Sequence, residues 1–190
     1  GGASINGQFL ASQPGAVANA FAAGINAGLT GQGASAVAVG HVAGNVSQGS
    51  FATALGYSAG VTRQSSSATA VGRGAGATDQ GESAVAVGRS AGLTSQGDNA
   101  IAIGNVAGQT GQGNTSVSIG VQSGQTDQGT SAVAIGQSSG QNTQGASAVA
   151  VGVNAGFGDP NDPTKGQGAN AVAVGNSAGK TSQSGGAVAV

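Results

Sequence analysis

The sequence predicts an all-β fold, a parallel β-solenoid of about ten 16-residue coils. Three observations predict it: a strict repeat, an alternating apolar segment in each repeat, and a composition dominated by small residues. Glycine supplies 39 of the 190 residues and alanine 37, whereas Cys, Met and Trp are absent. A core of large side chains is therefore excluded, because such cores draw most of their buried area from aromatic residues and leucine.

The repeat is marked by one glycine in each unit. This marker glycine recurs every 16 residues from Gly24 to Gly152, and it resumes at Gly175 after a step of 23, so that seven extra residues lie between Gly152 and Gly175. Positions in a coil are counted here from the marker, which is position 0. A second glycine stands at position 4, as at Gly44, and a glutamine at position 8, as at Gln48. Such a period predicts small units that bury their apolar surface only by stacking on their neighbours.

Each coil contains a segment in which alanine alternates with Val or Ile, for example residues 84–87 and 100–103. Val and Ile favour strands, and successive side chains of a strand point to opposite faces. A helix is disfavoured because glycine follows within five residues every time, at a cost of about 1 kcal/mol for each interior glycine. We expect a strand of four or five residues here and a second extended piece at residues such as 93–96. Coils stacked at ~4.8 Å would form a rod roughly 48 Å long.

The columns of the repeat indicate which positions are constrained. Positions 1 and 2 vary freely, as at His41 and Arg89, and we expect them to face solvent; position 3 is Ala or Ser and is expected to be buried. Position 6 is mostly Thr and position 8 is Gln, and we expect this pair to point inward or along a packed seam. Stacked glutamines can hydrogen-bond from coil to coil, which satisfies amides that are costly to bury alone.

Both faces of the alternating segment are apolar in nearly every coil, and the sequence leaves open which face lies inside. Whichever face lies outside forms a long apolar stripe, and soluble monomers avoid such stripes. We therefore expect a homo-oligomer, for which cyclic symmetry is the ordinary arrangement.

Charge and residue types exclude several functions. Five basic and six acidic residues form no basic stripe that could neutralise phosphates, so no nucleic-acid partner is expected. No apolar run approaches the ~20 residues that span a bilayer, so we expect no membrane insertion of this segment. His41 is the only histidine, and the many Ser and Thr lack a base to activate them. We expect no enzyme, no catalytic, cofactor-binding or metal site, and no cofactor.

Two segments depart from the repeat. Residues 1–16 are degenerate and are expected to be an N-terminal cap or junction, whereas residues 17–190 form the solenoid. In the seven-residue insertion, Asp159, Asn161 and Asp162 could offer oxygens to Ca²⁺, although such a sequence between prolines is more often a plain turn, and the loop could also serve recognition. The chain stops in mid-strand at residues 186–190, so we expect a fragment of a longer protein or an end that stacks on another molecule.

Residues 99–107 (NAIAIGNVA) and 83–91 (SAVAVGRSA) resemble the N-S-V-A-I-G-x-x-S head repeat of YadA-like trimeric autotransporter adhesins. The resemblance covers about residues 17–190. It implies a left-handed parallel β-roll, three chains wound side by side, and display on a bacterial outer surface for attachment. Similar A-V-A-I-G repeats occur in phage and giant-virus fibre proteins. The family's repeat is usually nearer fourteen residues, whereas this repeat has sixteen with an added T-x-Q-G segment.

We therefore expect a non-enzymatic, extracellular structural or adhesive rod at a cell or virion surface. Its partners would be itself, as a homotrimer that can also stack end to end, and an unknown surface receptor or matrix ligand. One alternative is a self-assembling fibre subunit of a bacterial filament or of a viral or phage fibre. Another is an ice-binding solenoid, because the threonines at position 6, from Thr30 to Thr181, share one column that Val46 and Asn142 interrupt.

Overall fold

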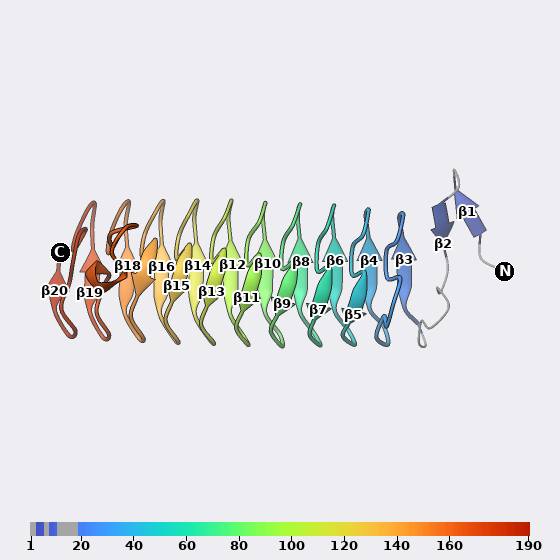
Figure 1. Cartoon of the computed structure of the whole chain (residues 1–190), viewed down its shortest axis with the longest axis horizontal. Coiled ribbons are helices and arrows are strands. Elements are labelled where there is room, and N and C mark those ends of the chain that lie inside the picture. Colours follow the sequence, from blue (N-terminus) through green and yellow to red (C-terminus); the bar gives the residue numbers. More distant parts are fainter. Residues whose placement is uncertain (1–2, 6–7, 11–18) are drawn as a thin grey trace.

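The structure is a computed structural model that describes residues 3–5, 8–10 and 19–190. It confirms an all-β parallel β-solenoid, drawn out as a row of stacked coils (Figure 1). Eleven coils are stacked, rather than about ten, because the largest sheet runs from Phe21–Ala23 to Val188–Ala189. The described residues form no α-helix, and none of their helices has the length and apolar character needed to cross a membrane.

An eleven-stranded parallel sheet takes one strand from each coil. Its neighbours pair in register, so that Ala86 lies beside Ala70 on one side and Ala102 on the other. The strands in spatial order are β3 (Phe21–Ala23), β4 (Val37–Val39), β6 (Thr53–Leu55), β8 (Thr69–Val71), β10 (Val85–Val87), β12 (Ile101–Ile103), β14 (Val117–Ile119), β16 (Val133–Ile135), β18 (Val149–Val151), β19 (Val172–Val174) and β20 (Val188–Ala189).

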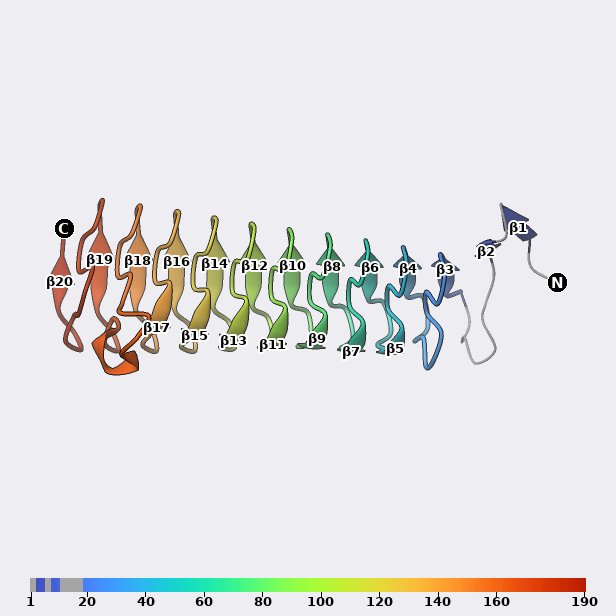
Figure 2. The same cartoon turned by 45° about the horizontal axis from the view of Figure 1, so that its top comes forward.

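A seven-stranded parallel sheet forms the other side of the coils, as the turned view shows (Figure 2). Isolated bridges continue its ladder beyond β5 to Thr30 and beyond β17 to Gln167 and Gln183. The strands are β5 (Val46–Gln48), β7 (Thr62–Gln64), β9 (Thr78–Gln80), β11 (Thr94–Gln96), β13 (Thr110–Gln112), β15 (Thr126–Gln128) and β17 (Asn142–Gln144).

The core between the two sheets is made of alanine and glutamine, with fully buried serine in place of alanine at Ser116, Ser118, Ser123 and Ser139. Ala36, Ala38 and Ala43, at positions 12, 14 and 3, are fully buried, and so are their equivalents in the neighbouring coils. Gln48 at position 8 is also buried. The face of the alternating segment that lies inside is therefore the alanine face, and Val and Ile point outward. A core this thin has room for alanine beside glutamine but none for a row of branched side chains.

The strands of the alternating segment are three residues long, or two in β20, shorter than the four or five expected. A left-handed residue at position 11 precedes each strand, and the marker glycine, also with positive φ, follows every strand but β20. Positions 2, 7 and 11 adopt the left-handed conformation, as at Ser90 (φ 55°), Ser95 (φ 55°) and Asn99 (φ 56°). Because position 7 is left-handed, positions 6 and 8 do not share a face as they would in a regular strand. The expected inward direction is therefore confirmed for glutamine only, and the threonines of position 6 are half-buried or exposed.

The two glycine columns lie where atoms of other residues approach the backbone too closely for a side chain. At the marker Gly104 (φ +134°), a Cβ would lie 2.4 Å from the carbonyl oxygen of Gly120 in the next coil. At Gly92 (φ +51°), position 4, a Cβ would lie 2.6 Å from the side-chain oxygen of Gln96. The marker glycine thus lets coils stack, and the second glycine makes room for the buried glutamine.

The expected cap or junction at residues 1–16 falls partly outside the described residues, which omit 1–2, 6–7 and 11–18. Within it, β1 (Ala3–Ile5) and β2 (Gln8–Leu10) pair antiparallel in a sheet of their own. The insertion forms an orange loop with the 3₁₀ turn η1 (Pro163–Lys165), which projects from the stack (Figure 2). The stack continues past this loop because Gln167 bridges Gln144 and Gln183.

Candidate functional site

The most unusual surface of the rod is the outer side of the eleven-stranded sheet, named here the apolar face. It consists of the side chains at positions 13 and 15, which point away from the core on both sides of the buried alanine. Those at position 13 are Phe21, Val37, Thr53, Thr69, Val85, Ile101, Val117, Val133, Val149, Val172 and Val188. Those at position 15 are Ala23, Val39, Leu55, Val71, Val87, Ile103, Ile119, Ile135, Val151, Val174 and Val190.

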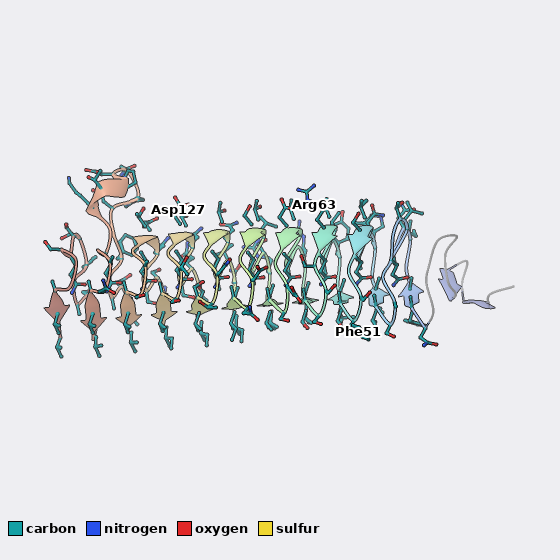
Figure 3. The ribbon with its side chains drawn as sticks, turned by 90° about the horizontal axis from the view of Figure 1, so that it is seen from below. Phe51, Arg63 and Asp127 are labelled. Atoms are coloured by element: carbon teal, nitrogen blue, oxygen red, sulfur yellow. The ribbon has the colours of Figure 1, made fainter. Side chains whose placement is uncertain are left out.

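The apolar face is continuous and open to solvent in the single chain. Ile103 is 39% exposed and Leu55 is 46% exposed, and none of the positions carries a charge. The in-register strands line these side chains up along the rod. Side chains project from the outer side of this sheet along its whole length (Figure 3). Eleven coils at ~4.8 Å give an apolar stripe about 50 Å long.

The outer side of the seven-stranded sheet, named here the polar face, has a different character. Its threonines at position 6 form a column, but the neighbouring position 7 varies, with Arg63, Asp79, Ser95 and Asp127 in different coils. Arg63 and Asp127 extend into solvent on this side (Figure 3). Arg63 forms an ion pair with Asp79 of the next coil, with 2.6 Å between Nη2 and Oδ2, and this hydrogen-bonded guanidinium lowers the pKa of Asp79.

The buried glutamines form a hydrogen-bonded ladder, as the sequence predicted. The Nε2 of Gln80 donates to the side-chain oxygen of Gln96 at 3.2 Å and to the backbone oxygen of Thr69 at 2.9 Å. The ladder is interrupted before Gln128, whose Oε1 instead accepts from the hydroxyl of Ser118 at 2.7 Å. In the described part of the chain, only Oε1 of Gln32 and Gln48, near the first coils, lack a partner. The glutamines therefore hold the core together and are not available to a ligand.

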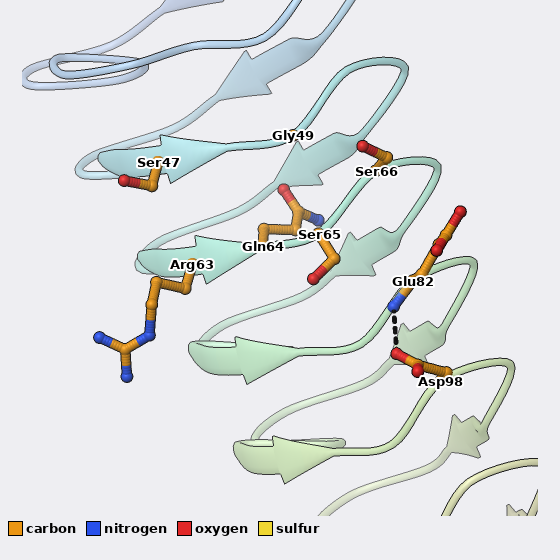
Figure 4. A pocket seen from close by; sticks show the side chains of 8 residues that line it. All are labelled: Ser47, Gly49, Arg63, Gln64, Ser65, Ser66, Glu82 and Asp98. Carbon is orange, nitrogen blue, oxygen red and sulfur yellow. Dashed lines mark hydrogen bonds between the residues drawn. The ribbon is translucent and has the colours of Figure 1, made fainter.

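A shallow hollow of about 450 Å³ lies beside position 9, where glycine or serine leaves little side-chain volume. Its rim carries Arg63, Glu82 and Asp98 (Figure 4). Asp98 accepts the backbone N–H of Glu82 at 2.8 Å, so one of its oxygens is occupied within the rod. The hollow thus holds charged side chains without a nucleophile paired to a base.

His41 and the insertion were the two places where the sequence left chemistry open. The His41 ring stacks on the Tyr57 ring, with centroids 5.0 Å apart and planes 9° from parallel, at an exposed corner. The histidine therefore packs on the aromatic side chain of the neighbouring coil at the surface of the rod.

The acidic residues of the insertion bind the turns of their own loop. Asp159 accepts the N–H of Asn161 at 2.9 Å. Asp162 accepts the N–H of Thr164 at 3.0 Å and its hydroxyl at 2.6 Å, which lowers the pKa of Asp162. Lys165 lies 3.4 Å from the same carboxylate. Within the described ranges, no three His, Cys, Asp or Glu side chains gather as a metal site would require, and the geometry is that of a plain turn loop.

Comparisons with models of protein families, with curated proteins and with solved structures find no match to this chain. The fold and its surfaces therefore define the class of protein, which is a parallel β-solenoid repeat protein with one apolar face and one polar face.

Proposed function

We propose that the protein is a non-enzymatic structural rod of a cell or virion surface. It assembles with copies of itself through the apolar face and presents the polar face for attachment to a receptor or matrix ligand. One observation carries the proposal: the apolar face runs without a charge through all eleven coils, and Thr53 and Thr69 are its only polar side chains. Such uniformity is expected where side chains are buried against a partner.

The energetics favour assembly. If each of about twenty outward side chains gained only about 1 kcal/mol on losing contact with water, the sum would be about 20 kcal/mol. The loss of translational and rotational freedom on association costs an estimated 4–15 kcal/mol. The apolar gain therefore exceeds the cost even when the side chains are only half exposed beforehand.

The finer form that we propose is a homotrimer of left-handed rolls, extracellular, with the three apolar faces turned toward a common axis. Support comes from the resemblance of residues 83–91 and 99–107 to the head repeats of YadA-like adhesins. A trimer also suits the shape of the rod, because three narrow faces can enclose a dry interior while three polar faces remain outside.

Small-angle X-ray scattering tests this assembly, because the mass per unit length of a rod does not depend on how rods join end to end. We expect three chains of 17.4 kDa in each rod length. A mass per length of a single chain would contradict the proposal. Attachment is tested with beads that carry the rod, under flow over matrix proteins or glycans; retention equal to that of bare beads would remove the adhesive part.

A second candidate function is ice binding, favoured by the threonine column. Thr62, Thr78, Thr94, Thr110 and Thr126 pair in register in five successive coils. Position 7 beside this column argues against ice binding, because its residues vary and some are charged, so they form no second regular column. Thermal hysteresis of the purified protein decides: we expect none at millimolar concentration, and a clear freezing-point gap would favour ice binding.

A further inference from the structure

Each coil has two edges that flank the apolar face. The exit edge is position 1, where the chain has just left the eleven-stranded sheet. The entry edge is formed by positions 10 and 11, where the chain is about to enter that sheet. Positions 1 and 11 are exposed in every coil, and among the described residues position 10 is exposed in all but Ala34 and Ser50, so each edge forms a row of side chains along the rod.

The two edges carry opposite charges in the same two coils. Arg73 and Arg89 occupy the exit edge, and Glu82 and Asp98 occupy the entry edge of the same coils, nine residues further along. All four side chains are exposed. Among the described residues the ion pairs are Arg63–Asp79 and Lys165–Asp162, so none of these four charges is neutralised within the chain.

We propose that the exit edge of one chain docks on the entry edge of a second copy. Arg73 and Arg89 then face Glu82 and Asp98 of the neighbouring copy, which sets the chains parallel and level. The inference rests on the proposed assembly through the apolar face and names what fixes its orientation and register. The occupant is a second copy of this chain because the complementary charges are its own.

Symmetry links this charge pattern to a parallel arrangement. Rotation about an axis parallel to the rod, of any order, brings the exit edge of one chain to the entry edge of the next. The two edges then lie within about half a coil of the same level, ~2.4 Å. A two-fold axis along the strand direction instead turns the rods antiparallel and places exit edge on exit edge. That arrangement leaves Arg73 and Arg89 without the acidic partners that the rotation supplies.

Other coils match across the same two edges. His41, stacked on Tyr57, occupies the exit edge of the coil whose entry edge carries Phe51, which is 67% exposed. Asn105 on the exit edge corresponds to Asn114 on the entry edge of its coil. In the register that pairs the charges, aromatic side chains on the exit edge of one chain therefore lie beside aromatic side chains on the entry edge of the next. Amide side chains likewise lie beside amides.

The apolar face alone cannot set this register. Its rows repeat in every coil, so a slip by one coil, ~4.8 Å, keeps nearly all of its contacts. The charges lie in only two coils, so the same slip unpairs part of them and places other charges beside uncharged residues. Exposed ion pairs add little affinity, but they do select orientation and partner.

Charge reversal tests the docking. In Arg73→Glu/Arg89→Glu both edges become acidic, and we expect assembly in about 50 mM salt to weaken by roughly tenfold or more, with a smaller effect in high salt. Adding Glu82→Arg and Asp98→Arg to the same chain exchanges the two edges and should restore assembly. The control Lys165→Glu/Lys180→Glu has the same change in net charge away from both edges and should assemble as the wild type does. Wild-type assembly of the double variant, or no recovery in the fourfold variant, would overturn the docking.

Cross-linking tests the orientation directly, because the chain has no cysteine of its own. Asn105→Cys/Asn114→Cys places one thiol on each edge of one coil. Under oxidation we expect covalently linked oligomers, while either single variant gives none. Covalent dimers of the Asn105→Cys chain alone, or an oligomer that the double variant leaves unlinked, would overturn the parallel and level arrangement. A wild-type chain that is monomeric at every salt concentration would instead overturn the proposed assembly as well.

Discussion

The two outer faces of the rod are built by the same eleven coils yet follow opposite rules. On the apolar face, Val85, Ile101 and Val117 in successive coils differ by little more than a methyl group. On the polar face, Asp79, Ser95 and Gly111 share one column and have almost nothing in common. Both columns have the same backbone register and comparable access to solvent in the single chain.

The contrast shows that the fold does not by itself determine which residue types stand at outward positions. The stacking of coils constrains the glycines, alanines and glutamines inside, and it leaves position 7 free to vary. Strand propensity accounts for β-branched residues at positions 13 and 15, where Thr53 and Thr69 stand beside Val and Ile, but it does not exclude charge. In the proposed assembly, a partner that buries these side chains supplies the further reason.

The largest expected effect breaks the apolar face. Ile103→Lys/Ile119→Lys places two ammonium groups where the partner chain would lie, and burying unpaired charges costs several kcal/mol. We expect the oligomer to dissociate into folded monomers, as followed by light scattering and circular dichroism. The control Ser95→Lys/Ser182→Lys adds the same charge at exposed residues on the other side of the rod and should leave the mass unchanged. Intact oligomers in the first variant would show that the apolar face is not the interface.

The next effect compares two glycines with positive φ. In Gly104→Ala the new Cβ meets the backbone oxygen of Gly120, and the stack must open, so we expect a loss of more than about 3 kcal/mol in unfolding free energy. In Gly111→Ala, at position 7, the nearest atom is the flexible carboxylate of Asp127, and other coils already carry serine here. Only about 1 kcal/mol should be lost there. Urea denaturation measures both, and equal losses would contradict the assigned role of the marker glycine.

A smaller effect compares two glutamines. Gln96→Ala removes bonds to the backbone of Val85 at 2.9 Å and to Gln112 at 3.2 Å, in a buried site, and should cost about 2–4 kcal/mol. Gln125→Ala removes the bond to Gln109 at 3.0 Å and the bond from Gln141 at 2.8 Å, both between half-buried side chains that water can reach. We expect less than about 1 kcal/mol in that case. Thermal denaturation of the two variants side by side gives the difference, and a stable Gln96→Ala chain would contradict a structural ladder.

The smallest effect concerns the ion pair of the polar face. Arg63 lowers the pKa of Asp79, so the carboxylate contributes stability above its unfolded pKa, and this contribution is lost as the pH falls through the folded pKa. In Arg63→Gln the pKa of Asp79, followed by NMR titration, should rise. An unchanged pKa would mean that the two side chains do not interact in solution, as happens for many exposed pairs.

Much of the fold follows from the sequence because repeat columns report constraint without an alignment. The glycine, alanine and glutamine columns predicted the stacking, the small buried residues and the amide ladder. The inner face of the alternating segment could not be predicted, because alanine and valine are both apolar and only the thickness of the coil excludes valine. The left-handed residues were not predicted because Ser and Asn, although common in turns, occur throughout the repeat, so that Ser90, Ser95 and Asn99 do not stand out.

The candidate site could be predicted in part. The sequence indicated an apolar stripe, since both faces of the alternating segment are apolar. It did not indicate that Arg73 and Glu82 stand on opposite edges of one coil, because this requires the number of residues between the two turns. The sequence also did not predict which way the Thr94 side chain points, since the left-handed Ser95 changes the alternation of a regular strand.

The molar mass of the purified chain tests the central claim most directly. Sedimentation equilibrium at micromolar concentration should give a multiple of the 17.4 kDa chain mass, and the trimer predicts three times that value. A mass of 17.4 kDa at every concentration would contradict the account, because the apolar face would then remain in water.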